Sequence, residues 1–125
     1  MKKVLVLDDD ISLLDIIKEV LLDANLLVRT VERGKDILTA IEEYKPDLIL
    51  LDYLAGDSNG GEICHQIKSG TLTRHIPVII MSAYPKVFLS LGSYGCDFFL
   101  PKPFDLTQLV RAVDDYSFKQ KKLCI

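Results

Sequence analysis

Carboxylate side chains stand at the ends of two short apolar segments of this 125-residue chain. Asp8 and Asp9 follow the apolar segment Lys3–Leu7, and Asp52 ends the apolar segment Leu48–Asp52. Neither segment alternates polar and apolar residues, which is typical of strands buried on both faces of a parallel sheet. Because open parallel sheets bind ligands at the carboxyl ends of their strands, we expect the three carboxylates to meet at one edge.

Three neighbouring carboxylates favour a cation, because each raises the pKa of the others until their charge is neutralised. A site of carboxylate, carbonyl and water oxygens suits a small hard cation, Mg²⁺ before Ca²⁺. A simpler interpretation is that acids after strands only cap the next helix, and we accept it for Asp10. It explains Asp8 and Asp9 less well, because a cap needs only one acid. The pattern therefore predicts a magnesium site.

Two further polar residues follow the later apolar segments. Ser82 comes after the segment 77–81, and Lys102 comes shortly after the segment 96–100. Taken singly, the first is an ordinary turn residue and the second an ordinary surface lysine. Beside a metal-bound carboxylate, however, a hydroxyl and an ammonium balance the charge on phosphoryl oxygens. The full set therefore indicates that Asp52 attacks phosphorus in line and becomes phosphorylated.

Strand and helix patterns alternate along the chain. Strands are expected at 3–7, 26–31, 48–52, 77–81 and 96–100, and helices at about 10–24, 34–45, 59–69 and after Pro103. The residues expected to face inward are Leu13, Ile16, Ile17, Val20 and Ala24 in the first helix and Leu106, Leu109, Val110 and Val113 in the last. Between Ser82 and Gly95 the pattern is poor, and residues 84–92 make a helix of two turns at most.

Five repeats of strand and helix define an α/β fold. Such alternation forces parallel strands joined by right-handed crossovers. We expect a (βα)5 three-layer sandwich of the flavodoxin-like type, with a parallel five-stranded sheet in the order 2-1-3-4-5. In that order the ends of strands one and three are neighbours, which places Asp8 and Asp9 beside Asp52.

The composition is that of one ordinary globular domain spanning residues 1–125, with 49% apolar and 26% charged residues. A net charge of −3 offers no general attraction for nucleic acid or anionic membranes. We interpret the short basic tail from about residue 119 as solvated and frayed. Three cysteines at unrelated spacings, no secretory signal and no apolar run of about 20 residues favour a cytoplasmic location.

From end to end, the chain resembles the receiver domain of two-component response regulators, including the single-domain regulators of chemotaxis. No one of the matching residues is specific, but the full set in this order and spacing is. The matching residues are Asp8-Asp9, Asp52, Gly60, Ser82-Ala83 and Lys102-Pro103-Phe104.

The resemblance implies a magnesium site and assigns its ligands. Asp9, Asp52 and the backbone carbonyl of Leu54 would bind Mg²⁺, and Asp8 would hold a metal-bound water. The peptide bond between Lys102 and Pro103 is expected to be cis, as is usual at this position in receiver domains.

The resemblance also assigns the phosphoryl chemistry. Asp52 would accept the phosphoryl group from a sensor histidine kinase, a phosphotransfer protein or a small phosphodonor, and Ser82 and Lys102 would bind its oxygens. Ser82 would move toward the phosphate while Phe99 turns inward, reshaping the face formed by helix four, strand five and helix five. That face would regulate an output protein or form a phosphorylation-dependent homodimer, without direct binding of nucleic acid or membrane. The only turnover implied is the domain's own phosphorylation and dephosphorylation.

Some positions depart from the receiver pattern. Ala55-Gly56 replaces the usual Met-Pro, which should make the loop after Asp52 more flexible. Pro101 replaces the common threonine, and the segment from Ser82 to Lys102 is slightly shorter than usual, in the region of helix four.

Leu54 and Tyr84 occupy the two positions that tune phosphate lifetime in the receiver family. One is apolar and the other is bulky and aromatic. We hypothesise that both hinder the attacking water and so prolong the phosphorylated state.

Several alternatives stay open. A Mg²⁺-dependent aspartate-nucleophile phosphatase of the haloacid dehalogenase type uses similar groups, but it wants an acid where this chain has Leu54, and usually a cap domain. A flavodoxin-like FMN carrier would need a phosphate-binding loop where Asp8 and Asp9 stand. A degenerate receiver would lack part of the acidic, hydroxyl and lysine set. The chain is either a stand-alone regulator, which a natural Met1 slightly favours, or a receiver module excised from a larger hybrid kinase or transcription factor.

Overall fold

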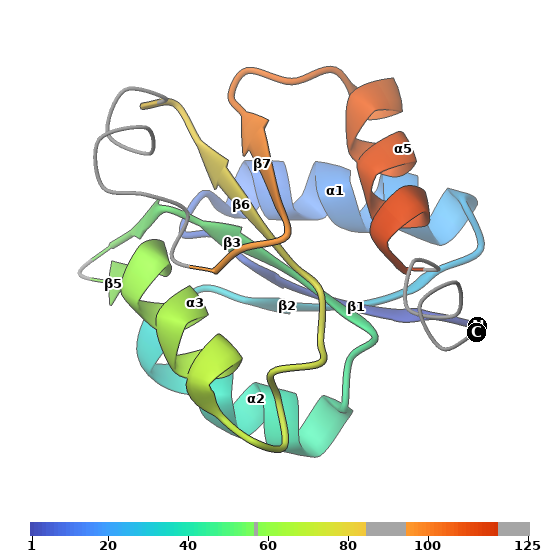
Figure 1. Ribbon diagram of the computed structural model, residues 1–125. Helices are drawn as coiled ribbons and strands as arrows, with labels where there is room; N and C mark the ends of the chain where they lie inside the picture. Colours follow the sequence, from blue (N-terminus) through green and yellow to red (C-terminus); the bar gives the residue numbers. More distant parts are fainter. Residues whose placement is uncertain (57, 85–94, 118–125) are drawn as a thin grey trace.

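The computed structural model describes residues 1–56, 58–84 and 95–117. At its centre lies a five-stranded sheet in the order β2-β1-β3-β6-β7, in which neighbouring strands run parallel (Figure 1). Counted within this sheet alone, the order is the predicted 2-1-3-4-5, so the flavodoxin-like topology is confirmed. The strands are β1 (Lys3–Leu7), β2 (Leu27–Val31), β3 (Leu48–Asp52), β6 (Val78–Ser82) and β7 (Phe98–Pro101).

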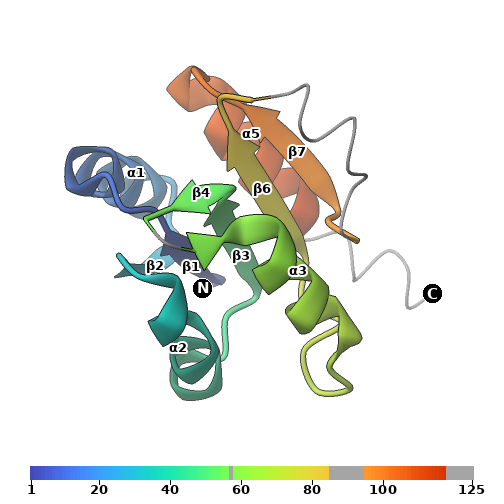
Figure 2. The same cartoon turned by 90° about the vertical axis from the view of Figure 1, so that its left-hand side faces the viewer.

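Helices cover both faces of the sheet and complete three layers (Figures 1 and 2). On one face lie α1 (Ile11–Asp23) and α5 (Leu106–Ser117), and on the other lie α2 (Ile37–Tyr44) and α3 (Gly60–Ser69). A short 3₁₀ helix, η1 (Gly34–Asp36), leads into α2. The predicted α/β/α sandwich is therefore confirmed.

The central strands are buried on both faces, as their unbroken apolar runs predict. Along β3, Ile49 and Leu51 pack with α2 and α3, whereas Leu48 and Leu50 pack with α1 and α5. All four side chains have no exposed surface. Full burial of each such side chain contributes about 1.5–3 kcal/mol, so the strand that ends in Asp52 is held firmly from both sides.

The inward face of α1 differs from the prediction. Leu14, Ile17 and Leu21 are buried, whereas the side chain of Ile16 is 46% exposed. Apolar residues occupy more than one side of this helix, and helical spacing alone does not say which stripe the sheet covers. The same reason applies to Leu106 at the start of α5, which was expected inward and is 43% exposed.

Two helices begin at side-chain caps. The carboxylate of Asp10 accepts a hydrogen bond of 3.2 Å from the backbone N–H of Leu13, which confirms its role as the N-cap of α1. The side chain of Asn59 accepts bonds from the N–H groups of Gly61 and Glu62 at the start of α3. Both caps satisfy amide groups that a helix leaves unpaired at its N-terminus.

The segment after Asp52 forms a small antiparallel hairpin, where the sequence predicted a turn and a more flexible loop. Its strands are β4 (Leu54–Ala55) and β5 (Ser58–Asn59), paired Leu54 with Asn59 and Ala55 with Ser58. Gly56 has φ +62°, the left-handed conformation that two-residue hairpin turns demand and that glycine adopts without strain. The predicted turn is confirmed, and the greater flexibility expected from Ala55-Gly56 stays a prediction.

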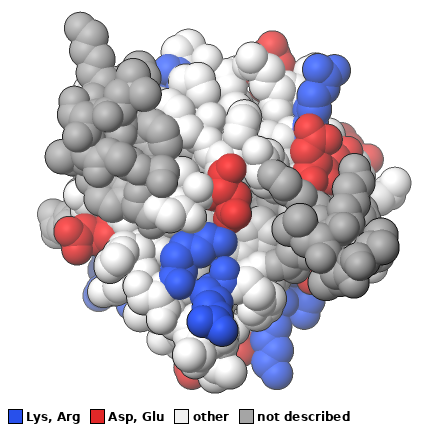
Figure 3. Space-filling view, in the orientation of Figure 1, with Lys and Arg blue, Asp and Glu red and all other residues white. Residues whose placement is uncertain are grey.

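On the face in Figure 3, positively and negatively charged side chains lie next to one another, and uncharged surface surrounds these groups. None of the helices in the described ranges has the length and apolarity that crossing a lipid bilayer requires. The segment 85–94, where most of a short fourth helix was predicted, and the basic tail from about 119 lie outside the described residues.

Candidate functional site

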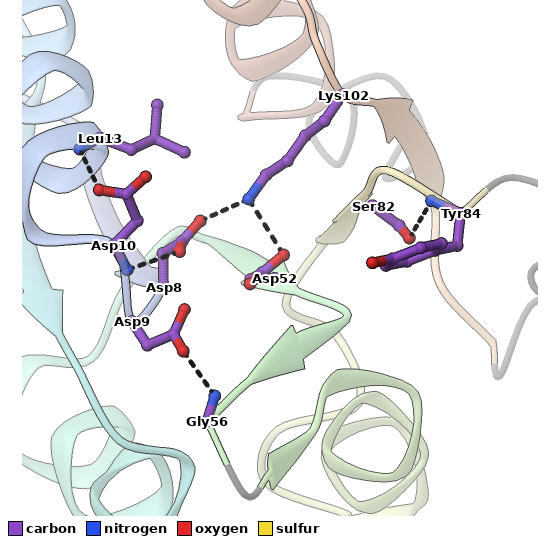
Figure 4. Close-up of polar contacts among 9 residues, drawn as sticks. All are labelled: Asp8, Asp9, Asp10, Leu13, Asp52, Gly56, Ser82, Tyr84 and Lys102. Atoms are coloured by element: carbon purple, nitrogen blue, oxygen red, sulfur yellow. Dashed lines mark hydrogen bonds and ion pairs between the residues drawn. The ribbon is translucent and has the colours of Figure 1, made fainter.

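The carboxyl ends of β1 and β3 bring three carboxylates together (Figure 4). Leu7 of β1 pairs with Leu51 of β3, so the next residues along each strand, Asp8 and Asp52, are neighbours. One carboxylate oxygen from each of Asp8, Asp9 and Asp52 lies within 4.8 Å of the other two. The predicted meeting of these residues at the switch point of the sheet is confirmed.

Lys102 reaches the same cluster from the segment after β7. Its ammonium Nζ lies 2.8 Å from Oδ2 of Asp8 and 3.1 Å from Oδ1 of Asp52. The peptide bond between Lys102 and Pro103 is cis, as expected. Three carboxylates therefore face one ammonium, and the cluster keeps a net negative charge.

Burial differs among the three carboxylates, and it raises the pKa of Asp52. Asp8 is 1% exposed and Asp52 is 7% exposed, whereas Asp9 is exposed to solvent. Burial, followed by the charge of Asp8, raises the pKa of Asp52 from 3.8 to about 6, although Lys102 opposes the shift. Burial would lower the pKa of Lys102, but its hydrogen bonds and ion pairs with Asp8 and Asp52 outweigh that effect and raise it.

These residues fit a divalent hard cation. The donors are carboxylate oxygens, which Mg²⁺ and Ca²⁺ prefer to nitrogen or sulfur. Three carboxylates lie together with one ammonium, that of Lys102, so one ammonium does not balance their charge. A cation bound to Asp9 and Asp52 would relieve that repulsion.

Ser82 lies on the strand next to Asp52, but its hydroxyl is hydrogen-bonded to a residue two positions further along the chain. It ends β6 and is 2% exposed, and its neighbour Met81 pairs with Asp52 across the sheet. Its hydroxyl oxygen accepts a hydrogen bond of 2.9 Å from the backbone N–H of Tyr84 (Figure 4). The structure thus places the hydroxyl near the cluster while its bond joins it to the segment that follows β6.

Phe99 sits in β7, paired with Ile80 of β6. It is partly buried and packs against the core cluster formed with α2 and α3. The interpretation of Phe99 as a core aromatic is consistent with this position. Its assignment as a switch residue stays a prediction.

Leu54, the expected carbonyl ligand, begins β4 two residues after Asp52, and its side chain is 49% exposed. Gly60, singled out with the phosphoacceptor, lies against the same strand. A Cβ at Gly60 would collide with the backbone carbonyl oxygen of Asp52. Because of this collision, only glycine permits the close approach. The N–H of Gly60 also donates a 2.7 Å hydrogen bond to the carbonyl of Tyr53.

One contact in the site was missed. The backbone N–H of Gly56 donates a hydrogen bond of 2.9 Å to Oδ2 of Asp9 (Figure 4). From the sequence, Ala55-Gly56 in place of the usual Met-Pro predicts only a more flexible loop. A glycine at the first position of a two-residue hairpin was the available signal that its amide would be fixed in space.

Comparison with known proteins agrees with this geometry. A family model described as the response regulator receiver domain matches residues 4–114. The DNA-binding transcriptional regulator NtrC of Salmonella typhimurium is 34% identical over 93% of this chain, which spans only 26% of the length of NtrC.

Two solved structures are similar over almost the whole chain. A CheY-like response regulator receiver domain protein from Methanospirillum hungatei has a TM-score of 0.87, 25% identity and 98% coverage of both chains. The response regulator TrrA from Thermotoga maritima, solved in complex with Mg²⁺-BeF, has a TM-score of 0.84 and 26% identity, covering 93% of this chain and 99% of TrrA.

Proposed function

The chain belongs to the family of response regulator receiver domains, and on this premise we propose that it is a phosphoacceptor switch in which Asp52 takes the phosphoryl group. The observation that carries the proposal is the convergence of Asp8, Asp9, Asp52 and Lys102 from three separate strand ends. Asp52 contacts Lys102 and adjoins both other carboxylates, and among these residues it is the one that matches the phosphoacceptor of the family.

Asp52 acts as the nucleophile. One of its carboxylate oxygens attacks phosphorus, and the bond from phosphorus to the donor breaks as its electron pair leaves with the donor group. The donor is the phosphohistidine of a sensor kinase or phosphotransfer protein, or a small acyl phosphate. With a pKa of about 6, Asp52 is mostly deprotonated at neutral pH and so carries the electron pair that the attack needs.

Asp9, Asp52 and the carbonyl of Leu54 would hold Mg²⁺, with Asp8 binding one of its waters. The cation supplies positive charge against the phosphoryl oxygens and against the repulsion among the carboxylates. TrrA, similar to this chain over nearly its whole length, was solved in complex with Mg²⁺-BeF, which supports this cofactor.

Lys102 and Ser82 would receive the phosphoryl oxygens. The ammonium that now bridges Asp8 and Asp52 pairs with one oxygen when Asp52 loses its free carboxylate. The Ser82 hydroxyl turns from the N–H of Tyr84 and donates to another. Because Ser82 and Phe99 lie on neighbouring strands of the sheet, this movement gives Phe99 a route to turn inward and alter the face that includes β7 and α5.

We place the output in protein contact through that face, with a partner protein or a second copy of the chain. The sensor kinase or phosphotransfer protein is the other partner. NtrC is described as a DNA-binding regulator, but this chain spans 26% of it. The net charge of −3 and the mixed charges in Figure 3 support protein contact over direct binding of nucleic acid. We propose no turnover of an external substrate.

The decisive experiment is phosphorylation by acetyl phosphate with Mg²⁺, followed by intact-mass measurement. Wild type should gain one phosphoryl group, and Asp52→Asn should gain none. Beryllofluoride should protect wild type, but not Asp52→Asn, from trypsin. Continued labelling of Asp52→Asn, or steady release of phosphate from p-nitrophenyl phosphate, would contradict the proposal.

A further inference from the structure

The tip of the β4–β5 hairpin is bonded to a carboxylate of the acidic cluster. The N–H of Gly56 donates to Oδ2 of Asp9 over 2.9 Å, although the two residues are 47 positions apart in the chain. Gly56 and Asp9 are both exposed to solvent. The bond is therefore a specific tertiary contact and not a product of tight packing.

This bond leaves the second oxygen of Asp9 available to the cluster. Figure 4 shows one oxygen of Asp9 bonded to Gly56 and the other on the side of Asp8 and Asp52. One oxygen of each of the three carboxylates lies within 4.8 Å of the others. A carboxylate held by one oxygen needs less reordering to bind a cation through the other.

The carboxylate of Asp9 also borders a second region, away from Asp8 and Asp52. A cleft of about 590 Å³ borders it on the side of β2 and η1, and the charged residues that line it with Asp9 are Glu32, Arg33 and Lys35, so two cations outnumber one further acid. Within the described part of the chain, neither cation has a hydrogen-bond or ion-pair partner. Without the bond to Gly56, the exposed Asp9 carboxylate would be drawn toward these cations and away from Asp52.

The hairpin that carries Gly56 is itself anchored. Ala55 is 2% exposed within the core cluster, and Ser58 packs so closely on Gly34 that a Cβ there would collide with its side chain. The N–H of Gly60 donates to the carbonyl of Tyr53 at the base of the hairpin. The donor is thus presented by a supported segment.

We propose that Gly56 is a positioning residue for cation binding, whose backbone N–H holds Asp9 toward Asp8 and Asp52 and away from Arg33 and Lys35. This role rests on the proposed function, because it concerns the same cation site. A proline, common at this position in the receiver domains that the chain resembles, has no N–H to donate. The hydrogen bond that positions Asp9 therefore requires the backbone N–H that Gly56 provides in this chain.

The test compares two substitutions of Gly56 in Mg²⁺ binding measured by calorimetry without a phosphodonor. Gly56→Ala and Gly56→Pro both disfavour φ +62°, but only proline removes the N–H. We expect Gly56→Pro to raise the Kd for Mg²⁺ about tenfold. Gly56→Ala should raise the Kd by at most about a third of that factor, because its amide remains. Equal weakening by both variants, or wild-type affinity in Gly56→Pro, would overturn the proposal.

A second measurement needs no variant at position 56. In wild type, the Gly56 amide should exchange slowly with solvent for an exposed turn, and its NMR shift should move when Mg²⁺ is added. Asp9→Ala should make that exchange fast, whereas Lys35→Ala should not. Fast exchange in wild type would overturn the proposal even if the proline variant failed to fold. Failure of wild type to bind Mg²⁺ would count against the proposed function as well, whereas wild-type affinity in Gly56→Pro would leave that function intact.

Discussion

The two sides of the acidic site differ in how far they are assembled. On the side of β1, β3 and β7, the ammonium of Lys102 already bridges Asp8 and Asp52, both of which are buried. On the side of β6, the hydroxyl of Ser82 is bonded to the backbone of Tyr84 instead of to the cluster. The first side is preorganised by charge and burial, and the second must change its hydrogen bond to take part in phosphoryl binding. Under the proposed function, this difference suits a switch, since the assembled side would bind the phosphoryl group and the Ser82 side would respond to it.

Removing the ammonium of Lys102 should have the largest effect on stability, because it disrupts the ion pairs of the assembled side. Lys102→Met leaves the buried carboxylates of Asp8 and Asp52 without a cation, so the free energy of unfolding should fall by about 2–3 kcal/mol at pH 7.5. Urea denaturation monitored by circular dichroism measures it. Lys35→Met, which removes an exposed lysine, is the matched control and should change stability by less than about 0.5 kcal/mol. Equal stability of the two variants would show that the bridge contributes little.

Removing the charge of Asp52 should change the free energy of unfolding by an amount that depends on pH. Its pKa is raised from 3.8 to about 6 in the fold, so the folded state holds this proton more tightly than the unfolded state does. The associated stability is complete below about pH 3.8 and is lost as the pH rises through 6. Asp52→Asn should therefore be more stable than wild type at pH 7.5 without divalent cations, by about 2 kcal/mol once partial solvent contact is considered.

Measuring the stability of wild type and Asp52→Asn at several pH values provides the control for this effect. The stability gained by Asp52→Asn should shrink as the pH is lowered from 7.5 to 4.5, because wild-type Asp52 then becomes protonated in the fold. Mg²⁺ should reduce the gain at pH 7.5 by binding wild type preferentially. A gain independent of pH would mean that charge at Asp52 is not its cause.

Ser82→Ala tests the side that must rearrange. Its hydroxyl bonds only to the nearby Tyr84 N–H among the described contacts, so stability should fall by less than about 1 kcal/mol. Phosphorylation by acetyl phosphate should slow about tenfold, because one phosphoryl oxygen loses a donor. Ser82→Thr keeps the hydroxyl and should retain most of the rate. A Ser82→Ala variant phosphorylated as fast as wild type would remove Ser82 from the site.

The smallest expected effect concerns the exposed flanks of the site. The side chains of Leu54 and Tyr84 are 49% and 56% exposed, close enough in sequence to Asp52 and Ser82 to shield the phosphoryl group from water. Tyr84→Ala should speed loss of the phosphoryl group about threefold, and Leu54→Ala less, as a barrier lowered by under 1 kcal/mol allows. Intact-mass measurements over time follow this loss. A slower rate in Tyr84→Ala would disprove the shielding hypothesis.

The sequence predicts the fold correctly where its signal is local and repeated along the chain. The unbroken apolar runs identified the strands, and their alternation with helices gave the strand order, which brought Asp8 beside Asp52. The prediction is wrong where several local arrangements are equally compatible with the pattern. The apolar residues of α1 could face inward by more than one stripe, and the structure buries Leu14 and Leu21 in place of Ile16.

The sequence alone determined that four strand ends would share one edge, because parallel connections leave no other arrangement for these segments. Only the tertiary structure decided which hydrogen bonds form there. The bond from Gly56 to Asp9 joins segments distant in the chain, and that from Tyr84 to Ser82 depends on how the segment leaves β6. Such contacts depend on distances of a few tenths of an ångström between segments, a precision that residue spacing along the chain does not contain.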